Sequence, residues 1–169
     1  MMDKQTLPRL RGAIFDMDGT LLDSMGMWRG AAAELVRRHG KTPEPDLLQK
    51  IVAMPLDEST AYLVGRYRLE ISPAALQEEF EQYLAGQYGQ QLRLKPGAAR
   101  LVRQLCAHGV PVALASATEL PLIKAAMRRL GLWDSFCMAA SCQQHGSKQR
   151  PDIYLAVSRV MGLAPAETA

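Results

Sequence analysis

Three short apolar runs constrain the fold of this chain more than any other feature of its sequence. They cover residues 13–15 (AIF), 110–115 (VPVALA) and 136–140 (FCMAA), and polar or small residues follow each of them. Runs that are apolar almost throughout, rather than at every second position, are typical of parallel strands that are buried on both faces. The sequence therefore predicts a small parallel sheet with helices on both of its sides.

Helical patterns separate and follow the later runs. They cover residues 98–108, 119–130 and 151–161, and in each of them apolar side chains recur at helical spacing. A glycine follows each pattern directly: Gly109, Gly131 and Gly162. Glycine in this place is typical of a helix C-terminus. The alternation of strand and helix predicts the α/β class with a doubly wound parallel sheet.

The stretch between the first two runs has a different character. Residues 24–92 contain no convincing strand pattern but four amphipathic helical segments. Breaks separate these segments at residues 40–45, at Pro55 and at residues 72–73. Several helices in a row favour a separate helical bundle over helical filler within one domain. We predict an α/β core made of residues 1–23 and 93–169, with a helical cap over residues 24–92 inserted into it.

Bulk composition excludes several classes of partner. The chain has 169 residues and a net charge of +3, from 20 basic and 17 acidic side chains, which does not favour nucleic acid or a membrane. The N-terminal stretch MMDKQTLPRLRG lacks the apolar segment of a signal peptide. Three cysteines, an odd number without metal-site spacing, argue against a disulfide framework. We therefore expect reduced, mostly buried thiols and a cytoplasmic protein.

The first apolar run leads into a pair of carboxylates. Asp16 and Asp18 follow it, and Gly19 and Thr20 come next. Ligands of an open parallel sheet bind beyond the carboxyl ends of its strands, where such a pair could hold Mg²⁺, attack a phosphorus centre or shuttle a proton. An Asp-Gly turn after a strand is also an ordinary structural feature, and the spacing alone does not decide. Because two like charges repel, we expect a positive group nearby.

The other two strand ends carry complementary side chains. Ser116 and Thr118 follow the second run, and Lys148 lies beyond the third. Hydroxyl groups can donate to phosphate oxygens, and an ammonium group can offset the charge of the carboxylates and of a phosphate. Each feature is common by itself, since hydroxyl residues occur in many strand-to-helix turns and loop lysines are usually solvated. Together, at successive strand ends of one sheet, they form a far more specific pattern.

Three segments resemble the signature motifs of the haloacid dehalogenase-like (HAD) hydrolase superfamily, whose members are mostly phosphatases and phosphomutases. IFDMDGTLLDS resembles the first motif, LASAT the second and SKQRPDIYL the third. The helical insert resembles the small cap of the β-phosphoglucomutase and phosphonatase-like branch. The resemblance runs from about residue 12 to the end of the sequence, with the motifs in the expected order.

The resemblance implies a role for each carboxylate of the pair. Asp16 would be the nucleophile that becomes an aspartyl phosphate, and Asp18 would be the general acid and then the general base. A Mg²⁺ ion would be held by the Asp16 carboxylate and by the backbone carbonyl of Asp18. This assignment agrees with the demand of phosphoryl transfer for positioning and charge neutralisation.

The resemblance also implies the residues that bind the phosphoryl group. Ser116, with Ala117 beside it, would hydrogen-bond the group in transfer, and Lys148 would offset the charge on that group and on Asp16. Thr20 is placed with the substrate-binding residues, where it would either position Asp18 or shape the turn. Asp152 is expected to be structural, because a carboxylate suits the first turn of a helix.

The sequence departs from the family pattern at its end. The superfamily has a fourth motif, with one or two acidic residues after a further strand that complete the Mg²⁺ site. Here the sequence reads GLAPAETA, which resembles the segment preceding that strand, and Glu167 is a poor substitute for the missing acids. We therefore expect a chain truncated before the fourth motif, or a natural short form, with weakened Mg²⁺ binding and an unpaired sheet edge.

The leading functional hypothesis is a Mg²⁺-dependent phosphohydrolase of a small phosphorylated metabolite. A sugar-phosphate mutase of the β-phosphoglucomutase type is the alternative, and a phosphonatase is less favoured because no lysine is suitably placed at the start of the cap. From another class, the chain could be an inactive fragment or a non-catalytic binding remnant. We expect a monomer or weak dimer. The basic residues of the cap do not separate these hypotheses: Arg29, Arg37, Arg38, Lys50, Arg66 and Arg68.

Overall fold

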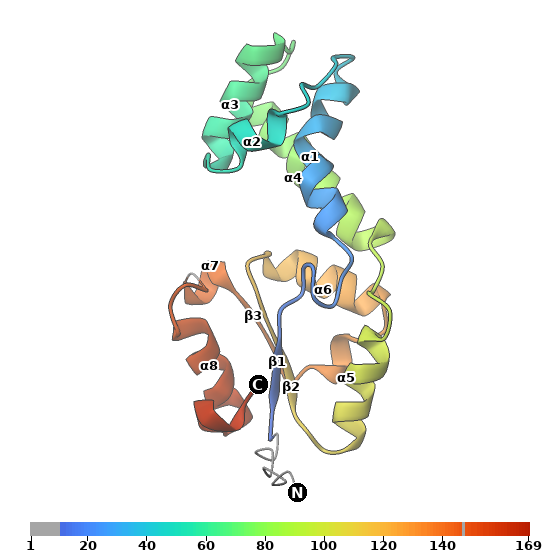
Figure 1. Cartoon of the computed structure of the whole chain (residues 1–169), viewed down its shortest axis with the longest axis vertical. Coiled ribbons are helices and arrows are strands. Elements are labelled where there is room, and N and C mark those ends of the chain that lie inside the picture. The colour runs from blue at the N-terminus through green and yellow to red at the C-terminus, as the bar shows by residue number, and fades with distance from the viewer. Residues whose placement is uncertain (1–10, 147) are drawn as a thin grey trace, which may run out of the picture. The chain divides into compact units, whose positions relative to one another are not determined.

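The sheet at the centre of the chain has three parallel strands. The computed structural model describes residues 11–146 and 148–169. Strands β1 (Ala13–Phe15), β2 (Val112–Ser116) and β3 (Met138–Ser141) pair in the order β1-β2-β3, so β2 is central (Figure 1). This confirms the parallel α/β sheet that the apolar runs predict. Residues 1–10, where the sequence predicts no signal peptide, lie outside the described residues. Ser147 of the third motif also lies outside them.

The register aligns the carboxyl ends of the strands. Phe15 pairs with Leu114 in the β1–β2 ladder, and Ser116 pairs with Ser141 in the β2–β3 ladder. All three strands run in the same direction. The loops that follow them therefore leave one edge of the sheet, which is where parallel sheets bind their ligands.

The outer edge of β1 is partly covered by the last residues of the chain. Thr168 forms an isolated parallel bridge with Gly12, the N–H of Ile14 donates to the carbonyl of Ala169 at 2.7 Å, and the N–H of Ala169 donates to the carbonyl of Gly12 at 3.1 Å. The bare edge expected from the sequence is therefore wrong for this part of β1. Thr168 and Ala169 extend the sheet by a fourth, very short parallel segment.

Helices cover both faces of the sheet (Figure 1). Helices α5 (Ala98–Ala107) and α6 (Leu120–Arg129) lie on one face, and the short α7 (Cys142–His145) and α8 (Asp152–Met161) lie on the other. Ile153 and Val157 of α8 pack with alanines of β2 and β3 in one buried cluster. Every residue of β2 is buried, as expected of a central strand with helices on both sides.

The ends of these helices agree with the sequence prediction. Gly109, Gly131 and Gly162 follow α5, α6 and α8 closely, and all three have positive φ angles, of 71°, 66° and 68°. Glycine adopts this conformation at little cost, which is why it ends a helix efficiently. Two 3₁₀ turns, η2 (Trp133–Ser135) and η3 (Pro165–Glu167), complete this part of the chain.

The inserted helices form a second compact unit with its own core. This unit comprises residues 24–87 and contains α1 (Met25–Arg38), α2 (Leu47–Ile51), α3 (Leu56–Tyr67) and α4 (Pro73–Gly86). Six buried side chains form its hydrophobic cluster: Leu35, Val36, Leu47, Leu63, Leu69 and Leu76. Each of the four amphipathic segments therefore contributes a helix.

The first unit resumes earlier than the sequence suggests. The structure divides the chain after Gln87, five residues before the expected boundary between residues 92 and 93. The reason is local packing around the π-helical turn η1 (Gln87–Gln91): Tyr88 and Leu92 are buried, and the guanidinium of Arg129 in α6 donates to both of their carbonyl oxygens. Residues 88–92 thus belong with the sheet.

Ion pairs occupy several of the basic side chains of the helical unit. Glu44 accepts hydrogen bonds from Lys50, at 2.8 Å, and from Arg66, and these two cations hold the pKa of the Glu44 carboxyl below its usual range. Arg37 and Arg38 pair with Glu34 one turn earlier on α1. These pairs lie on exposed faces of the helical unit.

Two of the cysteines are more exposed than the sequence suggests. All three are free, but Cys106 and Cys137 are exposed and Cys142 is only partly buried. Cys106 lies one turn beyond the buried Val102, near the end of α5, and its thiol donates to the carbonyl of Ser135 at 3.4 Å. The expectation of mostly buried thiols is therefore wrong.

Among the described residues, no helix has the length and apolar character needed to cross a membrane.

The core of the helical unit offers a direct test of its stability. Leu76 of α4 is fully buried, and we expect Leu76→Ala to lower the free energy of unfolding of this unit by about 2–4 kcal/mol, through lost burial and the cavity that remains. Urea unfolding followed by Trp28 fluorescence in a Trp133→Phe background would measure it. Leu48→Ala, at a position 36% exposed, is the matched control. Equal effects of the two substitutions would contradict this core.

Candidate active site

The turn after β1 fixes the two carboxylates. Met17, between Asp16 and Asp18, is fully buried, so its side chain anchors the turn. The Met17 carbonyl accepts hydrogen bonds from the N–H groups of Thr20, Leu21 and Leu22 at 3.3, 2.9 and 2.9 Å. Gly19 within the turn has a φ of 76°, a conformation that favours glycine. The sequence DMDGT thus folds into a tight loop with both carboxylates at the end of the strand.

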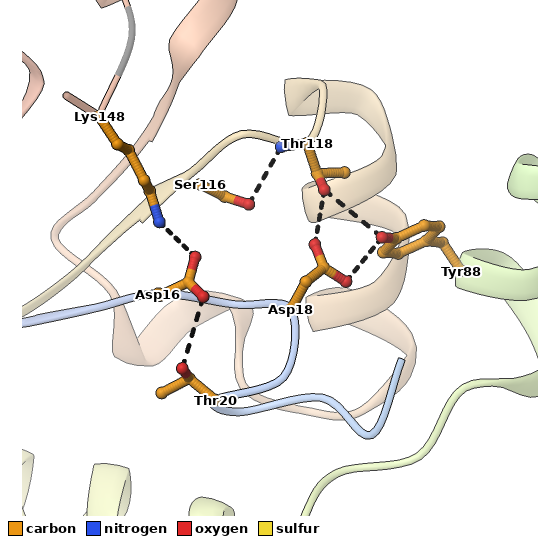
Figure 2. A network of polar contacts seen from close by, with 7 residues as sticks. All are labelled: Asp16, Asp18, Thr20, Tyr88, Ser116, Thr118 and Lys148. Carbon is orange, nitrogen blue, oxygen red and sulfur yellow. Dashed lines mark hydrogen bonds and ion pairs between the residues drawn. The ribbon is translucent and has the colours of Figure 1, made fainter. Parts of the chain in front are cut away.

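Lys148 lies against the first carboxylate. Its Nζ forms an ion pair with Oδ1 of Asp16, although the two residues come from opposite ends of the sequence (Figure 2). The side chain of Asp16 is 38% exposed and that of Lys148 is 26% exposed, so both groups remain open to a ligand. The positive group expected near the carboxylate pair is therefore present, and it contacts Asp16.

Thr20 also contacts Asp16. Its hydroxyl donates to Oδ2 of Asp16 at 3.4 Å, a long hydrogen bond (Figure 2). That Thr20 positions Asp18 stays a prediction. Together with its N–H bond to Met17, this contact assigns Thr20 to the shape of the turn and to the surroundings of Asp16.

Ser116 lies behind the exposed groups. It is the last residue of β2 and is only 1% exposed, and its Oγ accepts a hydrogen bond from the N–H of Thr118 at 3.1 Å. An accepting hydroxyl keeps its own proton for another acceptor. Ala117, the next residue, is exposed. The loop after β2 therefore places the exposed Ala117 beside the buried hydroxyl of Ser116 at the same strand end.

Asp18 has a different set of neighbours from Asp16. The hydroxyl of Tyr88 donates to its Oδ1 at 2.6 Å, and the hydroxyl of Thr118 donates to its Oδ2 at 2.6 Å (Figure 2). Sequence reasoning missed both contacts. Thr118 was visible only as one more hydroxyl residue after the second strand. No sequence pattern indicates that Tyr88 belongs to the site, because the sequence places it in the inserted helical segment, residues 24–92.

The oxygen ligands present suit a hard cation only in part. Asp16 and Asp18 supply the oxygen atoms that Mg²⁺ prefers. Among residues 11–146 and 148–169, however, no three His, Cys, Asp or Glu residues form a group that could hold a metal ion. Glu167 is occupied elsewhere: the N–H of Ala164 and the side chain of Arg11 bind it and hold the pKa of its carboxyl below the usual range.

Asp152 stands apart from these groups. It is the first residue of α8, and its carboxylate lies 3.1 Å from Nε of Arg150. A carboxylate at a helix N-terminus interacts favourably with the helix dipole. Its position supports the structural role expected from the sequence.

Comparisons with known proteins agree on one family. Residues 10–169 match the sequence model of the haloacid dehalogenase-like hydrolases. Hexitol phosphatase A of Escherichia coli K12 is 27% identical over 159 residues, which are 94% of this chain and 72% of that protein. Hexitol phosphatase B of the same organism is 30% identical over 166 residues, which are 93% of this chain and 72% of that protein.

The fold has relatives among solved structures as well. A HAD family hydrolase from Deinococcus radiodurans R1, solved with bound phosphate and sodium, superposes with a TM-score of 0.71 at 21% sequence identity. The match covers 96% of this chain and 72% of that one. At this level of identity the likeness concerns the fold.

Proposed function

The chain belongs to the haloacid dehalogenase-like hydrolases, and on that premise we propose that it is a Mg²⁺-dependent phosphatase of a small phosphorylated metabolite, acting through an aspartyl phosphate. The observation that carries the proposal is the ion pair between Lys148 and the half-exposed Asp16, with Asp18 two residues away. Two carboxylates after β1 and a cation from the loop region beyond β3 supply the nucleophile, the proton transfer and the charge neutralisation that phosphoryl transfer needs.

In the first half-reaction Asp16 attacks the phosphorus atom. A bond forms between a carboxylate oxygen of Asp16 and phosphorus, and the bond from phosphorus to the leaving oxygen breaks. Asp18, in its protonated form, gives its proton to that oxygen, so the product leaves as an alcohol. Lys148 stabilises the charge on the group in transfer, and the hydroxyl of Ser116 and the backbone of Ala117 are proposed to bind its oxygens.

In the second half-reaction a water molecule attacks the aspartyl phosphate. Asp18, now ionised, takes a proton from this water as the new oxygen–phosphorus bond forms. The bond between Asp16 and phosphorus breaks, which releases inorganic phosphate and restores the Asp16 carboxylate. Asp18 ends the cycle protonated, ready for the next substrate.

Mg²⁺ would be held by the carboxylate of Asp16 and the backbone carbonyl of Asp18. When bound, such an ion neutralises negative charge on the phosphoryl oxygens. Because few protein ligands are available among the described residues, we expect water molecules to fill much of its coordination shell and the affinity to be low.

The substrate class and the helical unit are part of the proposal. Two relatives are named hexitol phosphatases, which supports a phosphorylated sugar or polyol as the substrate here. We propose that residues 24–87 act as the cap that selects it. The free cysteines support a cytoplasmic setting. A sugar-phosphate mutase would use the same aspartyl phosphate but pass the phosphoryl group to a sugar hydroxyl in place of water.

Turnover of an aryl phosphate tests the proposal. We expect phosphate release that requires millimolar Mg²⁺, stops on addition of EDTA and returns when Mg²⁺ is restored. Binding of phosphate without any turnover would overturn the phosphatase and favour a non-catalytic remnant. A mutase would show itself by isomerising an added sugar phosphate while releasing little inorganic phosphate.

A further inference from the structure

We propose that Tyr88 and Thr118 are positioning residues that hold the Asp18 carboxylate in place for proton transfer. The inference rests on the proposed function, because it concerns the residue that would exchange protons in that reaction. Tyr88 reaches Asp18 from 70 residues away in the sequence, and Thr118 reaches it from 100 residues away. Neither belongs to the residues that would contact the phosphoryl group.

The contacts restrain both oxygens of the carboxylate. Tyr88 donates to Oδ1 and Thr118 donates to Oδ2, each at 2.6 Å, and the two hydroxyl oxygens lie 3.4 Å apart (Figure 2). Hydroxyl-to-carboxylate bonds of this length are among the strong hydrogen bonds of proteins. With a donor on each oxygen, the carboxylate cannot rotate without breaking at least one bond. Each oxygen still has a second lone pair, so the group can exchange a proton while it is held.

Both donors are themselves fixed. Tyr88 is fully buried, and Nε of Arg129 in α6 donates to its carbonyl oxygen at 3.3 Å. Thr118 is 8% exposed, and its N–H is bound to Ser116 at the end of β2. The two hydroxyls therefore come from a helix-anchored turn and from a strand end. Buried hydrogen bonds of this kind gain strength from the low local dielectric.

The two carboxylates, Asp16 and Asp18, have neighbours of different charge. Asp16 faces a cation, whereas the hydrogen bonds that Tyr88 and Thr118 donate to Asp18 come from neutral hydroxyl groups. A hydroxyl fixes direction without adding a charge to the site. A buried tyrosine that served the core alone could satisfy its hydroxyl with any backbone carbonyl. The meeting of two hydroxyls on one site carboxylate points to a role in the geometry of the reaction.

Substitutions that remove one hydroxyl each would test the inference. We expect Tyr88→Phe and Thr118→Val each to lower kcat roughly 10- to 100-fold with little change in KM, because a small displacement of a reacting group costs this much. The loss should grow with the pKa of the leaving alcohol, since poorer leaving groups depend more on the proton. Thr118→Ser, which restores the hydroxyl, should recover most of the activity. Tyr154→Phe, at a position 38% exposed, is the control.

A second measurement does not depend on activity. In a crystal structure of the Tyr88→Phe/Thr118→Val double variant, the Asp18 side chain should turn away from its wild-type orientation or become disordered. An unchanged Asp18 overturns the inference, whether or not the wild-type protein hydrolyses phosphate esters. So does a normal kcat with normal leaving-group dependence in an active protein. A wild type without turnover but with the expected change at Asp18 would refute the proposed function alone.

Discussion

Asp16→Asn is expected to abolish phosphate release, with a fall in kcat/KM on the order of 10³-fold or more. The amide has the shape of the carboxylate but is not a nucleophile, so no aspartyl phosphate can form. The substitution also removes the negative partner of Lys148. Because the Asp16 side chain is only partly buried and asparagine has nearly the same shape, we expect the folded structure to persist. The assay is initial-rate turnover of an aryl phosphate with Mg²⁺.

Asp134→Asn is the matched control for this experiment. Asp134 is an exposed carboxylate in the 3₁₀ turn η2, and its substitution should leave kcat/KM unchanged. Circular dichroism and thermal unfolding would show that both variants are folded. Residual turnover of Asp16→Asn within tenfold of the wild type would refute the assignment of Asp16 as the nucleophile. Labelling of the wild type, but not of the variant, by a ³²P-phosphoryl donor would support it.

Lys148→Met should lower kcat/KM roughly 10²- to 10³-fold, the usual cost of losing one group that stabilises charge in a transition state. Without the ammonium group, the repulsion between the Asp16 carboxylate and the incoming phosphoryl group would be offset less completely. Methionine keeps the length and apolar stem of lysine, so packing is largely preserved. Steady-state kinetics should show a lower kcat as well as a higher KM, because the charge on the group changes during transfer.

Two further substitutions sharpen this second test. Lys148→Arg keeps the charge but replaces a compact ammonium with a planar fork, and we expect it to recover only part of the activity. Arg150→Met removes a neighbouring cation that is 76% exposed and pairs with Asp152, and it should have no effect. An unaltered rate in Lys148→Met, or equal losses in Lys148→Met and Arg150→Met, would contradict the proposed role of Lys148.

Much of the fold follows from local pattern. The apolar runs before Asp16, before Ser116 and before the third motif become β1, β2 and β3, and the glycine-ended patterns become α5, α6 and α8. Such elements can be recognised because burial on two faces, helical periodicity and glycine stops are properties of neighbouring residues. Topology adds one further step, since parallel strands bring their carboxyl ends to one edge. This explains how Lys148 could be expected near Asp16 from sequence alone.

Other features depend on how surfaces meet, which no local pattern records. Cys106 and Val102 lie one turn apart on the same face of α5, yet only Val102 is buried, and Cys106 lies near the end of the helix. No break in the sequence pattern separates residues 88–92 from the helical segment before them. Only the hydrogen bonds from Arg129 to the carbonyls of Tyr88 and Leu92 indicate that they belong to the first unit.

The candidate site divides along the same line. The sequence by itself determined the identity of the carboxylate pair, the strand on which it stands and the lysine that accompanies it. Only the tertiary structure decided that Lys148 contacts Asp16. It also decided that Asp18 accepts hydrogen bonds from Tyr88, 70 residues away in the sequence, and from Thr118, 100 residues away. The physical reason is that a hydrogen bond depends on a fraction of an ångström in register and packing, whereas a sequence pattern specifies only the element on which a side chain lies.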